Sequence, residues 1–510
     1  MSAPVPIPIP ARRAGERRWD DEAFLWGVAT SADQHEGGLN GPGQPQNNWA
    51  WAERDNSVDP IGAAADFWNR AEADFARCRE LGLNSFRLGL SWARIQPSTV
   101  LDAPDKALPP PPFDEAALAR YGEILAGCRR AGLEPVLTLH HFTHPAWLGL
   151  DAWLKPETID LFLAFVEKSM GALLDAAKRD GVEPPRFLIT INEPNILASC
   201  TYFNGVFPGG ERGLRPTFAS LAHLLEAHVR AYRLLHGMYR ERGLFAPRVS
   251  FNNYCSDLYW NDQGWLDLLF APARGVPRER IFPYLWEQAW KLDDEFRRAK
   301  LPIRSALRRL SGFALKKIHH FAVYACSFDA SWNRLLDLLY EDRRVPVDYL
   351  AIDYYDPFVA HALRWPTWHD ALESHSRKPF HERLMDGMTN KWWDWRILPE
   401  GLAYFVRILK RFDLPILIAE NGMATRSDAR RHWGRRDNLL RSDFLRFHVA
   451  MVKKLKAEGA PIIGYMHWSL VDNYEWGTYV PRFGLFNRER EAVDHRGDNP
   501  GRTYAELISS

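Results

Sequence analysis

The sequence has few cysteines and no excess of charge of either sign. Its five cysteines are widely spaced, with no C-x-x-C pair and no zinc-ribbon spacing, and they are Cys78, Cys128, Cys200, Cys255 and Cys326. An odd, scattered set indicates a reducing compartment, so we expect a cytoplasmic protein. The 65 Lys and Arg residues balance 64 Asp and Glu residues. No overall field therefore favours nucleic acid, an anionic membrane or a polyanionic substrate.

A long apolar run is also missing. No stretch approaches the ~18 consecutive apolar residues that cross a bilayer, so we expect no membrane partner. Residues 1–18 are rich in proline and arginine, and the prolines interrupt the apolar positions that a secretory signal keeps continuous. We expect a disordered tail at 1–18 and one domain at 19–510. An Arg-rich organellar presequence is an alternative, although acidic residues and prolines make a poor amphipathic helix.

Eight short apolar runs bounded by turn residues predict β-strands. They lie at 24–30, 85–92, 135–141, 187–194, 248–254, 347–355, 415–422 and 461–470. Amphipathic patterns predict helices between most of them, at 71–81, 121–132, 159–181 and 442–459. Strand and helix in strict alternation indicate parallel strands joined by crossovers. The fold class that follows is α/β, with a single (β/α)8 barrel.

Polar residues gather directly after the predicted strands, whereas the short loops that lead from each helix into the next strand carry no such polar group. This polarity places a site at the carboxyl-terminal face of the barrel. A barrel without long loops needs ~250 residues. The additional residues of this chain fall in strand-to-helix connections, at 31–70, 200–222, 255–345, 356–400 and 423–440. No linker divides the chain, so we interpret these connections as walls of a deep pocket. The basic segment 293–310 predicts a solvated helix, not a nucleic-acid patch.

Two of the predicted strands end in a glutamate. FLITINEP ends in Asn192, Glu193 and Pro194, and ILIAENG ends with Glu420 ahead of Asn421 and a glycine. A strand that runs out into solvent would explain either glutamate alone. Strands four and seven, however, are three steps apart around an eight-stranded barrel, so both carboxylates can face each other across its mouth. Glycoside hydrolysis commonly uses such a pair, in which one carboxyl group protonates the leaving oxygen and the other attacks the sugar or activates water.

Further motifs occur in a fixed order along the chain. They are ATSADQHEGG, FRLGLSWARI, TLHHFTHPAWL, TINEP, AIDYY, IAENG, GYMHWSLVDNYEW and RFGLF. With these motifs the chain resembles glycoside hydrolase family 1, the family of β-glucosidases and β-galactosidases, from about residue 19 to about residue 490. The resemblance implies a retaining enzyme that releases the terminal non-reducing sugar of neutral β-glycosides, without metal or cofactor. We expect a β-glucosidase first, with galactosides and fucosides as alternatives.

The resemblance also implies catalytic roles. Glu420 would be the nucleophile, Arg87 would hold its pKa down, and Tyr355 would donate a hydrogen bond to it. Glu193 would be the general acid and then the base, with a raised pKa while uncharged. Asn192 would bind the sugar 2-hydroxyl. In this arrangement the two carboxyl groups lie ~5 to 5.5 Å apart, as in retaining enzymes.

Five further residues resemble the family's sugar-binding set. Gln34, His141 and Glu475 would bind hydroxyls, Trp468 would form a stacking floor, and Trp476 would donate its indole N–H. Without the resemblance, we would interpret Gln34 as a turn residue, His141 as a histidine of the core and Trp468 as an ordinary core residue.

Two positions depart from the family pattern. Phe142 stands where the family commonly has Trp, which removes an indole N–H, and Asp353 replaces a common Asn, which adds a carboxylate that we expect to raise the pKa of the nucleophile. Glu475 would repel a phosphate, so we expect neutral glycosides and not 6-phosphoglycosides. The Trp-rich segments 361–370 and 390–399 suggest an apolar or planar leaving group.

Two other functions compete with this one. A metal hydrolase on the same fold is suggested by His140, His141 and His144, although neighbouring residues of a strand point to opposite faces. A non-catalytic sugar-binding barrel is the second, since a fold does not guarantee activity.

Overall fold

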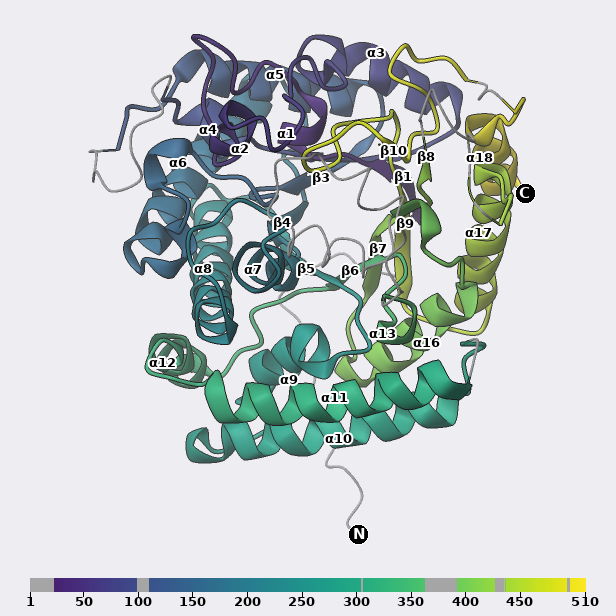
Figure 1. Cartoon of the computed structure of the whole chain (residues 1–510). Helices are drawn as coiled ribbons and strands as arrows, with labels where there is room; N and C mark the ends of the chain where they lie inside the picture. The colour runs from purple at the N-terminus through teal and green to yellow at the C-terminus, as the bar shows by residue number, and fades with distance from the viewer. Residues whose placement is uncertain are drawn as a thin grey trace.

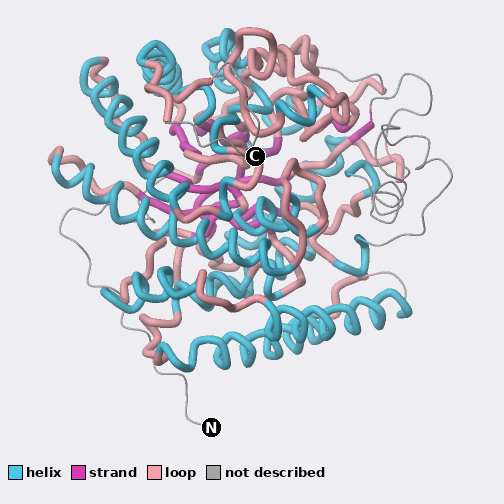
Figure 2. Tube along the Cα trace, turned by 60° about the vertical axis from the view of Figure 1, so that its left-hand side comes forward, coloured by secondary structure: helices cyan, strands magenta, loops and turns pink. Residues whose placement is uncertain are grey.

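The computed structural model describes residues 23–98, 110–303, 306–362, 392–426, 435, 437–492 and 496–510. The tail predicted at 1–18 lies outside them. Eight parallel strands close into a central barrel, and helices surround it (Figure 2). In order around the barrel the strands are β1 (Leu25–Ala29), β2 (Ser85–Gly89), β3 (Glu134–Thr138), β4 (Phe187–Asn192), β5 (Arg248–Tyr254), β6 (Leu350–Tyr354), β7 (Ile416–Asn421) and β9 (Ile462–Trp468). The predicted barrel is confirmed, and each predicted strand overlaps an observed one.

The strands separate two apolar cores. In β7, Leu417 and Ala419 pack inside the barrel, whereas Ile416 and Ile418 pack against the helices. This alternation follows from the two-residue period of a strand. Because both faces are covered, every residue of β7 is buried, which is why its sequence is a continuous apolar run until Glu420.

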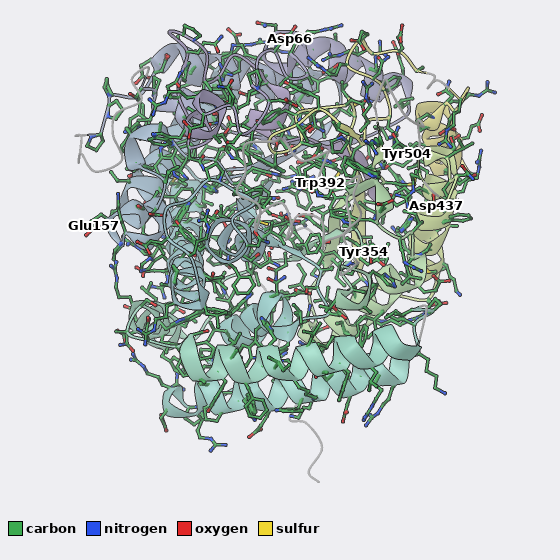
Figure 3. The ribbon with its side chains drawn as sticks, in the orientation of Figure 1. Asp66, Glu157, Tyr354, Trp392, Asp437 and Tyr504 are labelled. Atoms are coloured by element: carbon green, nitrogen blue, oxygen red, sulfur yellow. The ribbon has the colours of Figure 1, made fainter. Side chains whose placement is uncertain are left out.

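The outer layer consists of long helices that cover the barrel. They are α3 (Phe67–Glu80), α5 (Glu115–Arg130), α6 (Glu157–Arg179), α8 (Leu214–Glu241), α16 (Pro399–Leu409), α17 (Arg441–Ala457) and α18 (Pro500–Ser509). The four predicted helices fall on α3, α5, α6 and α17. Figure 3 shows Glu157 at the periphery, whereas Tyr354 and Trp392 lie within the ring of helices. Among the described residues, no helix combines the length and apolar character that a bilayer crossing requires.

The connection after β5 holds helices that the sequence patterns did not predict. They are α9 (Gln263–Phe270), α10 (Ile281–Ala299), α11 (Ala306–Cys326) and α12 (Trp332–Asp342). Helices α10 and α11 lie side by side along one flank of the barrel (Figure 1). The prediction of one helix at 293–310 is wrong, because α10 ends at Ala299 and α11 begins at Ala306.

Shorter elements complete the carboxyl-terminal loops. They are α1 (Ala32–His35), α2 (Ala50–Arg54), α4 (Trp92–Ile95), α7 (Pro194–Ala198), α13 (Val359–Ala362), β8 (Thr425–Arg426) and β10 (Pro481–Arg482). Of the expected pocket walls, 363–391, 427–434 and 436 lie outside the described residues.

Candidate active site

Irregularities in two strands turn polar residues toward the barrel mouth. The pairing of β4 with β5 shifts register between Ile189 and Asn192. Ile189 packs in the barrel interior and Ile191 against the helices, so the shift brings Asn192 back to the inner side. A similar shift in the pairing of β6 with β7 comes just before Asp353 and Glu420. β-Bulges commonly re-aim side chains next to active sites.

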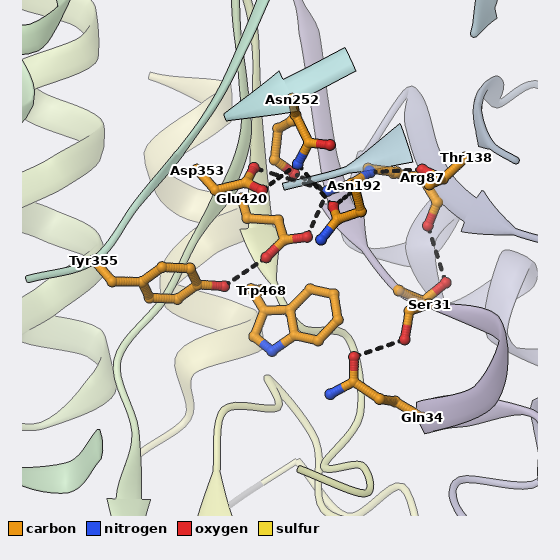
Figure 4. A network of polar contacts seen from close by, with 12 residues as sticks. Ser31, Gln34, Arg87, Thr138, Asn192, Asn252, Asp353, Tyr355, Glu420 and Trp468 are labelled. Atoms are coloured by element: carbon orange, nitrogen blue, oxygen red, sulfur yellow. Dashed lines mark hydrogen bonds and ion pairs between the residues drawn. The ribbon is translucent and has the colours of Figure 1, made fainter. Parts of the chain in front are cut away.

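Two donors hold Glu420 (Figure 4). Nη1 of Arg87 donates to Oε1 of Glu420 at 2.6 Å, and the hydroxyl of Tyr355 donates to Oε2 at 2.9 Å. Burial raises the pKa of Glu420 above its usual value, and the Arg87 charge and the Tyr355 hydrogen bond oppose this rise. The expected lowering by Arg87 is therefore present, but burial outweighs it. Both donors favour the ionised carboxylate.

Glu193 follows β4 in a strained backbone conformation. Its φ of +38° lies in the left-handed region, and its N–H donates to the carbonyl oxygen of Asn252 at 2.9 Å. Burial, then the charges of Asp353 and Glu420, raise the pKa of Glu193 well above its usual value, and Arg87 opposes them. Carboxyl oxygens of Glu193 and Glu420 lie within 4.8 Å of each other. The environments of the two groups thus favour a protonated Glu193 and an ionised Glu420.

Asp353 adds a third buried carboxyl group. Its Oδ2 accepts from Nδ2 of Asn252, and its Oδ1 lies 3.9 Å from Nη1 of Arg87. Burial, then the charge of Glu420, raise the pKa of Asp353 well above its usual value, and the charge of Arg87 opposes this rise. The pKa of Glu420 is raised as expected, but burial causes this rise. The charge of Asp353 instead raises the pKa of Glu193.

These three acidic groups could together hold a cation. One oxygen from each of Glu193, Asp353 and Glu420 lies within 4.8 Å of the others, and hard divalent ions prefer such oxygen ligands. The guanidinium of Arg87 is fully buried beside them and already supplies positive charge.

A polar network joins the two halves of the site. Nη2 of Arg87 and Nδ2 of Asn252 both donate to Oδ1 of Asn192, the latter at 2.7 Å, and Nε of Arg87 donates to Oγ1 of Thr138 at 3.0 Å. Asn192 is thereby linked through Arg87 to Glu420 and through Asn252 to Asp353. The sequence patterns missed Asn252, which lies within β5, and Thr138, which ends β3.

The predicted hydroxyl-binding residues meet at the opposite side of the mouth. Nε2 of Gln34 donates to Oε2 of Glu475 at 3.2 Å, and Nε1 of Trp468 donates to Oε1 of Glu475 at 3.1 Å. Ser31 and Asn473, which were not predicted, hold the amide of Gln34. Burial raises the pKa of Glu475 to about 8. Gln34, Glu475 and Trp468 thus form one connected group.

Aromatic rings line the remaining wall. The ring of His141 stacks on those of Trp468 and Trp476, each with a centroid distance of 5.9 Å. Phe142 packs against Trp476 at 5.1 Å and against Phe207 at 5.2 Å. Phe142 occupies the wall as an apolar surface, and its ring has no N–H to offer a sugar.

The three histidines of TLHHFTH have separate surroundings. His140 packs edge-on against Trp153, His141 stacks on Trp468, and Nε2 of His144 contacts the carbonyl oxygen of Gly149 at 2.9 Å. Burial lowers the pKa of His140 to about 3 and of His144 to about 4. Their side chains do not converge on one point, so this geometry does not support the metal hydrolase alternative.

The chain was compared with known proteins. The family model described as glycosyl hydrolase family 1 matches residues 17–252 and 329–510. β-Glucosidase A of Thermotoga maritima is 25% identical over 502 residues, covering 96% of this chain and 97% of the relative. A 6-phospho-β-galactosidase of Staphylococcus aureus is 25% identical over 508 residues, covering 96% and 98%.

Solved structures show the same fold. The T. maritima β-glucosidase in complex with castanospermine has a TM-score of 0.64 at 21% identity, covering 96% of this chain and 98% of that one. The β-glycosidase of Pyrococcus horikoshii has a TM-score of 0.59 at 22% identity, covering 96% and 94%.

Proposed function

Since the chain belongs to glycosyl hydrolase family 1 and is a glycoside hydrolase, we propose that it is a retaining β-glycosidase that acts on neutral β-glycosides, with β-glucosides preferred. One observation carries the proposal. Two buried glutamates at the carboxyl ends of β4 and β7 have oxygens within 4.8 Å of each other. Only one of the two, Glu420, is held by an arginine at 2.6 Å. Close carboxyl groups with different charge states are what double displacement needs.

In the first step, an oxygen of Glu420 attacks the anomeric carbon while the bond to the leaving oxygen breaks. Glu193 gives its proton to that oxygen, so the aglycone leaves as an alcohol. The product is a glycosyl ester on Glu420. Asn192, whose side-chain oxygen is held by Arg87 and Asn252, would bind the 2-hydroxyl in the transition state.

In the second step, water attacks the same carbon from the opposite side and Glu193 takes its proton. The ester bond breaks and Glu420 returns to its ionised form. Because esterification has removed the charge of Glu420, the pKa of Glu193 falls and its carboxylate can act as the base. Two inversions at one carbon retain the anomeric configuration.

The charges around Glu475 favour a neutral sugar. Burial is the main cause that raises the pKa of Glu475, and the acidic groups of Glu420 and Asp472 raise it further. A 6-phosphate beside these carboxyl groups would meet repulsion, and phosphate sites normally supply Lys or Arg. This supports neutral glycosides over the 6-phosphoglycosides that the name of the staphylococcal relative indicates.

The described part of the second Trp-rich segment supports an apolar leaving group. Trp392 and Trp393 are half-buried against the inner core, and the ring of Trp395 lies 5.6 Å from that of Tyr355. Tyr355 binds the nucleophile, so these rings stand near the exit of the sugar site. The segment 363–370 lies outside the described residues.

The cysteines are consistent with the reducing, cytoplasmic setting that we propose. Cys78, Cys128, Cys200 and Cys255 are free thiols, and all but Cys200 are buried. Burial raises the pKa of the Cys128 thiol, which makes it a weak nucleophile at neutral pH.

The test is the configuration of the sugar that is released first. Proton NMR of an aryl β-glucoside during early turnover should show the β-anomer before mutarotation produces the α-anomer. Initial release of the α-anomer would contradict retention. Absence of turnover on a broad panel of aryl β-glycosides would instead favour the non-catalytic alternative.

A further inference from the structure

The solvent-exposed face of helix α11 is apolar, whereas an ordinary surface helix exposes its polar face. Helix α11 exposes apolar side chains that recur every three or four residues, among them Leu310, Ile318 and Phe321, which are 66%, 65% and 62% exposed. Phe313 and Tyr324 lie on the same face and are also exposed. A surface helix normally buries its apolar stripe. Contiguous exposed apolar surface of this kind marks an interaction site.

Polar contacts fix α11 to the rest of the protein. Lys316 is buried and pairs with Asp257 at 2.9 Å. His320 and Lys317 contact Asp293 of α10 at 3.2 and 3.1 Å. These contacts set the rotation of α11, so its apolar stripe faces outward as a consequence of the fold.

Aromatic side chains of α10 extend the exposed face. The ring of Trp286 packs against those of Phe321 and Tyr324, at 5.2 and 4.8 Å. Nζ of Lys317 lies 3.2 Å from the ring centroid of Trp290. Trp and Tyr beside Lys are the residues that settle at the boundary between headgroups and acyl chains.

The hairpin carries an excess of positive charge. Between Ile281 and Cys326 the sequence has nine lysines and arginines against four aspartates and glutamates, whereas the whole chain has a net charge of only +1. Exposed basic residues of the hairpin include Arg298 and Lys300, at the junction of α10 and α11. Exposed basic side chains beside an apolar face are complementary to an anionic lipid surface.

The hairpin is also separate from the matched part of the family. Residues 253–328, which contain α10 and α11, lie between the two ranges that the family model matches. The proposed catalytic residues and the barrel strands, apart from Asn253 and Tyr254 at the end of β5, lie within the matched ranges. The exposed apolar side chains of α11 belong to neither the barrel interior nor the candidate active site.

We propose that the hairpin of α10 and α11 binds the surface of a membrane that contains anionic lipids, with the apolar face of α11 inserted among the headgroups. The helices lie on the bilayer and do not cross it, which agrees with the absence of a spanning helix among the described residues. This departs from the expectation of no membrane partner, which rested on the balanced total charge and the lack of a long apolar run. Nucleic acid fits less well, because Leu, Ile and Phe side chains have no role on a phosphate backbone.

Flotation of the full chain with vesicles tests the proposal. Vesicles of phosphatidylcholine with phosphatidylglycerol should bind the protein at least about tenfold more strongly than phosphatidylcholine alone, and added salt should weaken this binding. The double variant Ile318→Ser with Phe321→Ser should reduce binding about tenfold or more. The matched control is Phe245→Ser with Phe447→Ser, which removes two exposed rings outside the hairpin and should bind as the unchanged protein does.

A second variant, Arg298→Glu with Lys300→Glu, tests the charge separately and leaves the apolar face intact. It should lose the preference for anionic vesicles. Hydrolysis of a soluble aryl glycoside verifies that each variant is folded. Absence of vesicle binding, equal binding to neutral vesicles, or binding unaffected by the serine variant would overturn the proposal. A dimer that the serine variant dissociates, without vesicle binding, would overturn it in favour of an interface between two copies.

Discussion

Buried carboxyl oxygens of Glu193 and Asp353 lie within 4.8 Å of each other, and burial raises the pKa of both groups well above the usual value. After burial, the charge of Asp353 is the largest contribution that raises the pKa of Glu193, ahead of that of Glu420. Asp353 occupies a position where the family commonly has Asn, so in this chain an additional carboxyl group favours the protonated form of Glu193, the proposed general acid.

Asp353→Asn should move the basic limb of the pH profile of kcat/KM to lower pH. The substitution removes a negative charge that raises the pKa of Glu193, so Glu193 loses its catalytic proton at a lower pH. Asp348→Asn is the control, because Asp348 contacts Tyr232 and His236 just before the start of β6, at the other end of the barrel. A basic limb that stays in place or moves to higher pH would show that Asp353 does not act on the acid.

Tyr355→Phe should raise the pKa of Glu420 and reduce kcat/KM by about 10- to 100-fold. The hydroxyl of Tyr355 donates to Glu420 and lowers its pKa, so its loss should move the acidic limb to higher pH. Tyr354→Phe is the neighbouring control, since its hydroxyl donates to the carbonyl oxygen of Leu398 on the other side of the strand. An acidic limb that is the same in both variants would argue against this role of Tyr355.

Glu193→Gln should have an effect that depends on the leaving group. An alkyl glucoside needs a proton on its leaving oxygen, so kcat/KM should fall by about 10² to 10⁴. A dinitrophenyl glucoside leaves as a stable anion, and its first step should be little changed. Asn195, two residues after Glu193, is not a suitable control position, because its side-chain amide donates hydrogen bonds to two backbone carbonyl oxygens. We therefore compare two substrates on one variant, and equal losses on both would contradict the acid role.

The unchanged protein should prefer an aryl β-glucoside over its 6-phosphate by at least about a hundredfold. The pKa of Glu475 is about 8, and the group is ionised above that pH, so the preference should increase as the pH rises through 8. Glu475→Gln should narrow the preference and remove this pH dependence. Comparable kcat/KM values for both substrates in the unchanged protein would favour a 6-phosphoglycosidase.

The barrel and the meeting of Glu193 and Glu420 at its mouth were predictable from the sequence because they rest on strong local patterns. Runs such as the one that ends in Glu420 are apolar on both faces, as expected for parallel strands covered by helices on one side and barrel interior on the other. Asn252 was missed because its role depends on a neighbouring strand, where its amide meets Asn192 and Asp353. The sequence also could not show whether burial or the charge of Arg87 has the larger effect on the pKa of Glu420, because burial depends on the whole fold. The apolar face of α11 was hidden for the same reason, because only packing shows which side is exposed.

The central claim, that Glu420 is the nucleophile of a double displacement, is tested most directly by Glu420→Gly with and without azide. The variant should lose hydrolysis of an aryl β-glucoside by about 10⁴-fold or more. Azide fits the space that the side chain leaves and should restore release of the aryl group, with an α-glucosyl azide as product because one inversion remains. Rescue that gives a β-glucosyl azide would contradict the account and assign the nucleophile to another carboxyl group.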